Sequence, residues 1–252
     1  MTTLPAPRSP LPAPEKTIFI STGDVSGDLQ GSLLVTALKQ LAQTLGIDLK
    51  IVALGGGKMA AAGAEILADT TGISSMGMWE ALAYIQPSFK IKSIAKKYLK
   101  TNPPDAIVLI DYIVANVEIG NYAHTQLPRV PISYYIAPQE WVWSIGTKKT
   151  DAIVKFTDKI LAIFPGEAKY FSERGAKVNY VGHPLIDRVA TLASRAVARD
   201  KLGITDDDIA IALIPASRKQ ELRYLLPAIF GAAQQIQAQL PHVRFWIPLS
   251  RD

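Results

Sequence analysis

A short β-rich run passes directly into a helical pattern in the stretch Thr17-Ile18-Phe19-Ile20-Ser21-Thr22-Gly23-Asp24-Val25-Ser26-Gly27-Asp28. The apolar run Thr17–Ser21 predicts a buried strand, and Gly23 and Gly27 permit a tight turn behind it. A helix is then expected from about Asp28 to Leu45. This strand–turn–helix unit is the building block of a parallel sheet with crossover helices.

The same alternation continues along the chain. Further strands are predicted at Leu49–Leu54, Ala106–Ile110, Pro131–Ile136, Lys159–Ile163 and Lys177–Val181, with a helix across Gly166–Arg174. An α/β fold with a Rossmann-like parallel sheet follows from this order.

The chain divides into a lead, two domains and a connector. Residues 1–16 form a loose proline-rich lead, 17–184 the first Rossmann-like domain, 185–203 a charged, alanine-rich connector and 204–252 an incomplete second domain. In the last part we expect the strand Ile209–Pro215, the helix Lys219–Leu240 and the strand Val243–Leu249. One such unit is too small to bury a parallel sheet on both faces, so we expect either a partner that completes it or a longer protein.

The composition of the 252 residues, with 48% hydrophobic and 19% charged residues, indicates a soluble globular protein. No window approaches a membrane span, and residues 1–16 lack the apolar core of a secretory signal. Cysteine is absent, which excludes disulfides and thiolate catalysis and agrees with a cytoplasmic location. Three scattered histidines predict no metal site, and no cofactor is expected.

The net charge of +5 and the pI near 9.3 suggest an anionic partner: nucleic acid, a phosphorylated substrate or a membrane surface. No acidic residue occurs in 81–104, where lysines follow apolar residues at helical spacing. We expect an interfacial helix, with Pro87 marking a kink or a new helix start; the alternative is an ordinary surface helix packed on the sheet. Nucleic acid is disfavoured, because no recognition motif for it appears in the sequence. The predicted membrane contacts are Met78, Trp79, Leu82, Ile85, Phe89, Lys90, Lys96 and Lys97.

The turn behind the first strand is a candidate ligand site. Its glycines do not have dinucleotide-binding spacing, and its two aspartates would repel a pyrophosphate, so sugar hydroxyls fit better. The alternative is that Ser26 or Asp28 only caps the helix. The candidate residues are Gly23, Asp24, Ser26, Gly27 and Asp28.

The loop behind the strand Pro131–Ile136 is a second candidate. It carries Glu140, Trp141 and Trp143 at the carboxyl end of a strand, where open α/β sheets bind ligands. The alternative is an apolar loop that covers the sheet edge.

Two residues are candidate bases. Asp111 closes the run Ala106–Ile110, and His183 follows the last strand of the first domain. Asp111 can instead cap a turn or pair with a lysine, and His183 can bond a backbone carbonyl at a hinge.

A diphosphate site is expected where the second domain begins. Ser217 and Gln220 form a capping-box pattern at a helix start. Arg218 on that turn opposes the helix dipole unless it meets an anion, so Ser217 and Arg218 are candidate diphosphate ligands.

From about Ile18 to Asp252 the chain resembles the lipid-A-disaccharide synthase family, its cyanobacterial members in particular. The resemblance rests on the order and spacing of short motifs: residues 23–28, Gly55-Gly56-Gly57-Lys58-Met59 with Gly63, Met76-Gly77 with Glu80, Ile110-Asp111, residues 134–143, Phe164-Pro165 with Glu167, residues 181–184 and Pro215-Ala216-Ser217-Arg218.

The resemblance implies a two-domain GT-B glycosyltransferase that is peripheral to the cytoplasmic side of the inner membrane. Its substrates would be UDP-2,3-diacylglucosamine and 2,3-diacylglucosamine 1-phosphate, joined with inversion and without a metal or cofactor. Asp111 matches the family's proposed catalytic aspartate, and Arg218 an arginine suited to a phosphate. The residues 78–100 then form the docking surface, and homo-oligomerisation is left open.

The chain departs from the family pattern at three places. Residues 110–116 read Ile-Asp-Tyr-Ile-Val-Ala-Asn where the family often has Ile-Asp-Ala-Pro-Asp-Phe-Asn, and Ala216 replaces a glycine. The rest of the second domain is missing. Two alternatives therefore stay open: a truncated or degenerate non-catalytic homologue that binds lipid or sugar phosphate, and a GT-B-type nucleotide-sugar epimerase.

Overall fold

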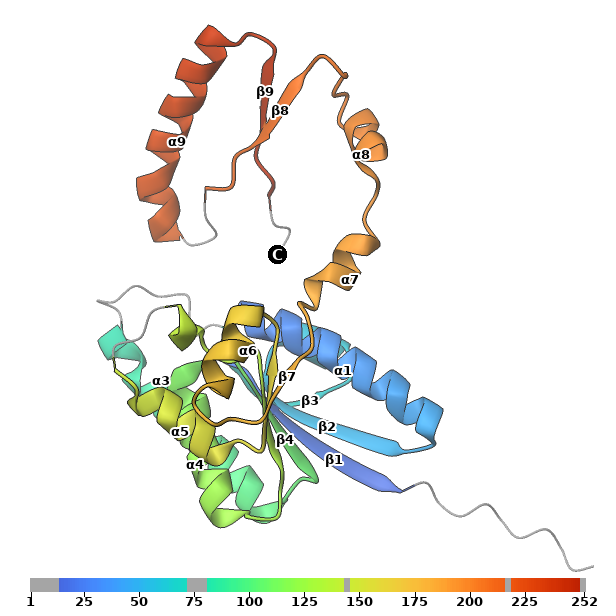
Figure 1. Ribbon diagram of the computed structural model, residues 1–252, viewed down its shortest axis with the longest axis vertical. Helices are drawn as coiled ribbons and strands as arrows, with labels where there is room; N and C mark the ends of the chain where they lie inside the picture. The colour runs from blue at the N-terminus through green and yellow to red at the C-terminus, as the bar shows by residue number, and fades with distance from the viewer. Residues whose placement is uncertain (1–13, 72–80, 143–145, 216–218, 250–252) are drawn as a thin grey trace, which may run out of the picture. The chain divides into compact units, whose positions relative to one another are not determined.

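The computed structural model describes residues 14–71, 81–142, 146–215 and 219–249, and for 81–88 and 219–220 only the backbone (Figure 1). The chain divides into two compact units, Met1–Pro184 and Leu185–Asp252.

The first unit contains a seven-stranded parallel sheet, which confirms the predicted fold class. Its strand order is β3-β2-β1-β4-β5-β6-β7. The strands are β1 (Glu15–Ser21), β2 (Asp48–Gly55), β3 (Glu65–Asp69), β4 (Ala106–Ile110), β5 (Ile132–Tyr135), β6 (Lys159–Ala162) and β7 (Val178–Tyr180).

Helices cover both faces of this sheet (Figure 1). They are α1 (Val25–Leu45), α2 (Gly57–Ala61), α3 (Ala81–Thr101), α4 (Ile113–Gln126), α5 (Lys148–Phe156) and α6 (Pro165–Ser172), with the 3₁₀ helix η1 (Gln139–Trp141). In Figure 1, α1 lies on one side of the sheet, and α3, α4 and α5 lie on the other.

The core forms one cluster on each face of the sheet. Side chains alternate along β1, so that Phe19 packs with Leu99 of α3 and Ile119 of α4, whereas Ile20 packs with Val35 of α1. Burial on both faces explains why the central strands are continuous apolar runs rather than alternating ones.

Three local predictions need correction. Helix α1 begins at Val25 rather than Asp28, because the Asp24 carboxylate caps it and accepts a hydrogen bond from Gly27 N at 2.5 Å. Strand β3 was not predicted; it is a short edge strand whose residues are exposed or only partly buried, so it has no long apolar run. Helix α3 begins at Ala81, so Pro87 lies inside it and does not start a helix, while the alternative of a kink there stays a prediction.

The second unit contains the predicted strand–helix–strand order. Strands β8 (Ile209–Ala212) and β9 (Val243–Trp246) pair in parallel, and α9 (Lys219–Gln239) connects them. Both strands end earlier than predicted. The segment expected to be a connector contains two short helices, α7 (Leu185–Ala190) and α8 (Arg195–Lys201).

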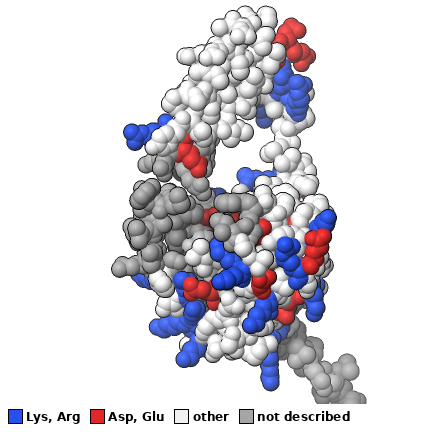
Figure 2. All heavy atoms as spheres, turned by 60° about the vertical axis from the view of Figure 1, so that its left-hand side comes forward, with Lys and Arg blue, Asp and Glu red and all other residues white. Residues whose placement is uncertain are grey.

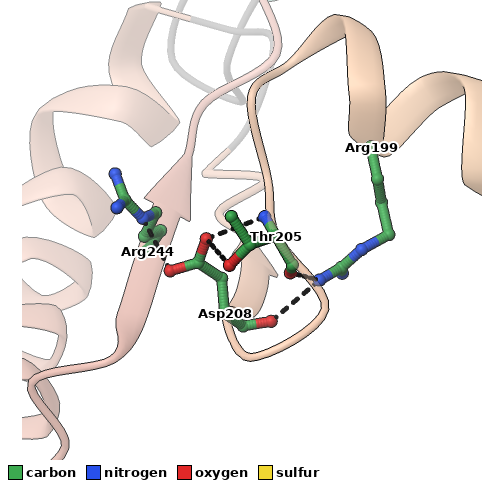
Figure 3. Close-up of polar contacts among 4 residues, drawn as sticks. All are labelled: Arg199, Thr205, Asp208 and Arg244. Carbon is green, nitrogen blue, oxygen red and sulfur yellow. Dashed lines mark hydrogen bonds and ion pairs between the residues drawn. The ribbon is translucent and has the colours of Figure 1, made fainter.

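A polar cluster joins α8, the turn before β8 and strand β9 (Figure 3). Asp208 accepts hydrogen bonds from the backbone N and the hydroxyl of Thr205 at 2.9 and 2.8 Å, and from Arg244 Nε at 2.8 Å. The Arg199 guanidinium donates to the carbonyls of Thr205 and Asp208. These side chains therefore connect segments of the second unit that lie far apart in the sequence, from Arg199 to Arg244, 45 positions further on.

Candidate active site

The carboxyl ends of β1 and β4 lie side by side at the centre of the sheet. From β1 the sheet continues through β2 to β3, and from β4 it continues the other way to β7. A reversal of this kind opens a crevice at the carboxyl ends of the two central strands, which is where open α/β sheets bind ligands. Asp24 follows β1 at this point, and Asp111 follows β4.

Asp111 has an unusual backbone and a shifted pKa. Its φ is 45° and that of Tyr112 is 37°, both in the left-handed region that residues other than glycine seldom adopt. Burial raises the pKa of the Asp111 carboxyl, and the nearby Asp24 carboxylate raises it further. A partly buried carboxylate of raised basicity at the carboxyl end of a central strand has the properties of a general base.

A buried polar network fixes the peptide at Asp111. The Asn116 side-chain amide donates to the carbonyls of Ile110 at 2.9 Å and Asp111 at 3.0 Å, and its oxygen accepts from Ser21 Oγ at 2.7 Å. The Tyr134 hydroxyl donates to the Asp111 carbonyl at 2.6 Å. Ser21, Asn116 and Tyr134 are fully buried, so this arrangement is shielded from water. Sequence reasoning missed all three as site residues.

The predicted glycine–aspartate turn contains residues in two different settings. Asp24 is half-buried, Ser26 is exposed and Gly23 and Gly27 are buried. Asp28 is only 2% exposed, and its carboxylate accepts hydrogen bonds from the backbone N of Gly56, Lys58 and Met59 at 2.8–3.0 Å. Asp28 therefore braces the start of α2, a structural role that does not support the prediction of a ligand contact.

Glu167 is a second buried carboxylate near Asp111. It is 1% exposed and accepts hydrogen bonds from the backbone N of Ala137 at 2.7 Å and of Ile163 at 2.8 Å. Burial raises its pKa, as does Asp111, while its backbone donors lower it. The side chain joins the loops behind β5 and β6. The sequence signal that could have identified Glu167 as a site residue is its place as a carboxylate in the first turn of a predicted helix, here α6.

Aromatic rings gather beside this carboxylate. The ring of Trp141 lies 5.7 Å from that of Phe164, which meets the ring of His183 edge-on at 5.3 Å. The predicted residues Trp141 and His183 thus contact the same ring, and both are partly exposed, as is Glu140. Phe164, 38% exposed, was not predicted as a site residue.

Several predicted site residues cannot be placed. Met78, Trp79, Trp143, Ser217 and Arg218 lie outside the described residues, and the side chains of Leu82 and Ile85 are not described either.

The lysines of α3 differ from one another in their surroundings. Lys92 is 6% exposed, and its ammonium forms an ion pair with Glu118 of α4 at 2.5 Å; Lys96 lies 3.6 Å from the same carboxylate. Lys90 and Lys97 are exposed. In the first unit as Figure 2 shows it, basic side chains are interspersed with acidic ones.

The described apolar face of α3 packs on the sheet through Ile91, Ala95 and Leu99, as the surface-helix alternative predicts. Phe89 is 61% exposed. Among the described helices, none combines the length and hydropathy that a membrane span requires. The described residues also contain no cluster of three or more His, Asp or Glu side chains that could hold a metal ion.

Solved structures show which fold the chain shares. A UDP complex of MnaA from S. aureus superimposes with a TM-score of 0.64 at 16% identity, over 94% of this chain and 62% of that one. The UDP-GlcNAc 2-epimerase from Neisseria meningitidis bound to UDP-GlcNAc gives 0.60 at 12% identity over 94% and 66%, and the glycotransferase of kitacinnamycin gives 0.56 at 13% over 95% and 67%. The chain thus has the fold shared by GT-B glycosyltransferases and UDP-sugar epimerases.

Sequence similarity then identifies the family. The sequence model for lipid-A-disaccharide synthetase matches residues 18–252. The lipid-A-disaccharide synthase of Synechocystis sp. (strain ATCC 27184 / PCC 6803 / Kazusa) is 56% identical over 234 residues, and that of Gloeothece citriformis (strain PCC 7424) is 55% identical over 235. The chain belongs to the lipid-A-disaccharide synthetase family, as its motifs predicted. The matches cover 92% and 93% of this chain but 59% and 61% of the two relatives.

Proposed function

We propose that this chain supplies the acceptor side of an inverting glycosyltransferase that joins UDP-2,3-diacylglucosamine to 2,3-diacylglucosamine 1-phosphate. The proposal rests on membership of the family and on one observation, the half-buried Asp111 at the crevice between β1 and β4. The likeness to epimerases carries no weight for activity, because at 11–13% identity it reflects only the fold.

In the proposed reaction Asp111 acts as the general base. It takes the proton from the acceptor 6-hydroxyl as that oxygen attacks the anomeric carbon of the donor. The bond from this carbon to the diphosphate breaks, and UDP leaves with the electron pair, so the product is a β-1,6-linked disaccharide. The raised pKa of Asp111 suits this step, because a stronger base holds the proton better at the transition state.

The other predicted residues have supporting roles in this proposal. His183 is the alternative base and contacts Phe164, next to Trp141. Asp24 and Glu140 are polar residues suited to sugar hydroxyls at the same edge of the sheet. Ser217 and Arg218 are proposed to hold the diphosphate of the donor.

Membrane association is the second part of the proposal. Both substrates carry acyl chains, so we place the enzyme on the inner surface of an anionic membrane, with α3 as the docking element. The exposed ring of Phe89 and the exposed ammonium groups of Lys90 and Lys97 support this assignment. Lys92, paired with Glu118, is assigned a structural role instead.

A chimera tests the activity. Residues 1–252 are joined to the segment that follows the matched region in the Synechocystis relative, and the product and released UDP are measured with the two acylated substrates. We expect disaccharide formation, and a loss of at least about a hundredfold in kcat in Asp111→Asn, within the range that general-base catalysis contributes.

The Synechocystis enzyme itself, assayed in parallel, is the positive control. A folded chimera that forms no disaccharide while the control is active contradicts the proposal and favours the non-catalytic homologue. Turnover of unacylated UDP-N-acetylglucosamine to an epimer favours the epimerase alternative.

A further inference from the structure

Three residues with left-handed backbone meet at the candidate base. Asp111, Tyr112 and Ile136 have φ values of 45°, 37° and 58°, and the backbone N of Asp111 donates to the carbonyl of Ile136 at 3.0 Å. Such conformations are costly for residues with a Cβ, above all for a β-branched one. They persist only where the surrounding contacts impose them, which is typical of functional sites.

The contacts that impose this conformation are directional and buried. The carbonyl of Asp111 accepts two hydrogen bonds, one from the Tyr134 hydroxyl at 2.6 Å and one from the Asn116 amide at 3.0 Å. The two donors are side chains on different elements, β5 and α4. Together their hydrogen bonds fix the plane of the Asp111–Tyr112 peptide. The side chain of Asp111 leaves the backbone at a direction set by that plane.

Ser21 fixes the orientation of the Asn116 amide. Its hydroxyl donates to Asn116 Oδ1, so the NH₂ group of Asn116 must face the carbonyls of Ile110 and Asp111. The network therefore runs from the end of β1 through α4 to the end of β4, the two strands that flank the crevice. Burial also raises the pKa of Tyr134 well above its ordinary value, so its hydroxyl keeps its proton and remains a donor.

We propose that Tyr134 and Asn116 are positioning residues for the general base: they hold the strained Asp111–Tyr112 peptide so that the Asp111 carboxylate stays in the crevice. The inference rests on the proposed function only in treating Asp111 as the base. Both side chains are fully buried. Both act through the backbone of Asp111, which distinguishes them from the residues assigned to ligand contact.

The surroundings of Asp111 make its pKa a reporter of this position. Three titratable groups interact electrostatically with the Asp111 carboxyl: Asp24 at the start of α1, Glu167 on α6 and Tyr134 on β5. Its raised pKa depends on burial and on closeness to Asp24. If the peptide relaxes, the carboxyl gains water and moves away from Asp24, and its pKa falls toward the ordinary aspartate value of about 3.9.

The test is a ¹³C NMR titration of aspartate carboxyl groups in the 252-residue chain, with the Asp111 signal assigned by its loss in Asp111→Asn. Tyr134→Phe removes one hydrogen bond and keeps the ring. The control is Tyr135→Phe, at the next position of β5, whose side chain packs in the cluster on the opposite face of the sheet with Ile20 and Ile110. We expect the pKa of Asp111 to fall by about 0.5 to 1 in Tyr134→Phe and to stay unchanged in Tyr135→Phe.

A kinetic measurement in the chimera gives an independent result. A positioning role predicts that Tyr134→Phe lowers kcat about tenfold or more with little change in KM, because the base is misplaced while the substrate contacts remain. Ser21→Ala, a smaller change that releases the Asn116 amide, should shift the pKa in the same direction and replaces Tyr134→Phe if that variant does not fold.

An unchanged pKa of Asp111 in folded Tyr134→Phe and Ser21→Ala overturns the proposal, as does an equal shift in Tyr135→Phe. The titration needs no enzymatic turnover. An inactive chimera with the expected pKa shift would therefore refute the proposed function and leave the positioning network intact.

Discussion

The ring of Tyr112 occupies the space that a side chain at Gly23 would need. A Cβ added to Gly23 would lie 1.8 Å from Cγ of Tyr112 and 2.0 Å from Cδ1. Cγ is the ring atom attached to the backbone through a single carbon, so the ring cannot yield by a small rotation. The glycine behind β1 is thus required by the left-handed Tyr112 behind β4, in addition to any role in binding a ligand.

We predict that Gly23→Ala lowers the free energy of unfolding by about 1–3 kcal/mol, the usual cost of an overpacked core position. Urea denaturation followed by circular dichroism measures it. Gly57→Ala is the matched control, because an added Cβ would meet no atom within 4 Å beyond its chain neighbours and its own helix backbone, and its φ is not positive. That variant should be neutral or stabilising by up to about 1 kcal/mol. If the Tyr112 ring causes the loss, Tyr112→Ala should relieve most of it in the double variant.

Asp28→Ala should destabilise the first unit. It removes the acceptor of three backbone donors at the start of α2, at Gly56, Lys58 and Met59, in a site that is 2% exposed. Buried donors without a partner cost about 1–3 kcal/mol each, so a loss of at least ~2 kcal/mol in the free energy of unfolding is expected. Asp48→Ala, at an exposed position at the start of β2, should change it by less than about 0.5 kcal/mol. Equal effects of the two substitutions would refute the bracing role.

The second unit should lose stability at acid pH through Asp208. The hydrogen bond from Arg244 and those from Thr205 lower the pKa of Asp208 to about 2. Because the folded value lies below the ordinary one of about 3.9, the ionised carboxylate stabilises the unit above that pH, and this contribution is lost as pH falls toward 2. Figure 3 shows the hydrogen bonds from Thr205 and Arg244 that the Asp208 carboxylate accepts.

A carboxyl NMR titration of Arg244→Met checks this assignment. The pKa of Asp208 should rise toward its ordinary value, whereas Arg223→Met, at an exposed position on α9, should leave it near 2. A value that stays near 2 in Arg244→Met would show that Thr205 alone sets the pKa.

Membrane docking through α3 predicts a division among its lysines. Replacing exposed Lys90 and Lys97 with glutamine should weaken binding to anionic vesicles by roughly fivefold for each charge, since a lysine near such a surface contributes about 1 kcal/mol. Lys92→Gln should leave vesicle binding unchanged and lower the free energy of unfolding, because its ammonium is buried against Glu118. Sedimentation with vesicles at low and high salt measures binding, which salt should screen. Binding that none of the exposed lysines affects would contradict the docking surface.

The fold class could be predicted from the sequence because apolar runs and turn residues are signals carried by residues close together in the chain. Apolar runs such as Ala106–Ile110, bounded by turn residues, show where strands lie, and the sheet they form has the expected parallel class. The edge strand Glu65–Asp69 was missed because its burial is partial and its composition is mixed. The ion pair of Lys92 could not be predicted from the sequence, because its partner Glu118 lies on another helix.

What the sequence by itself determined was the alternation of strands and helices, the family and the position of Asp111 at the end of a strand. Only the tertiary structure decided that β1 and β4 are neighbours, and this adjacency brings Ser21 within 2.7 Å of Asn116, 95 positions away. It also decided that Asp28 braces α2 and that Glu167 joins two loops. The physical reason is the range of the forces involved. Periodicity and turn preferences act between near neighbours in the chain, whereas buried hydrogen bonds and pKa shifts depend on which distant segments pack together.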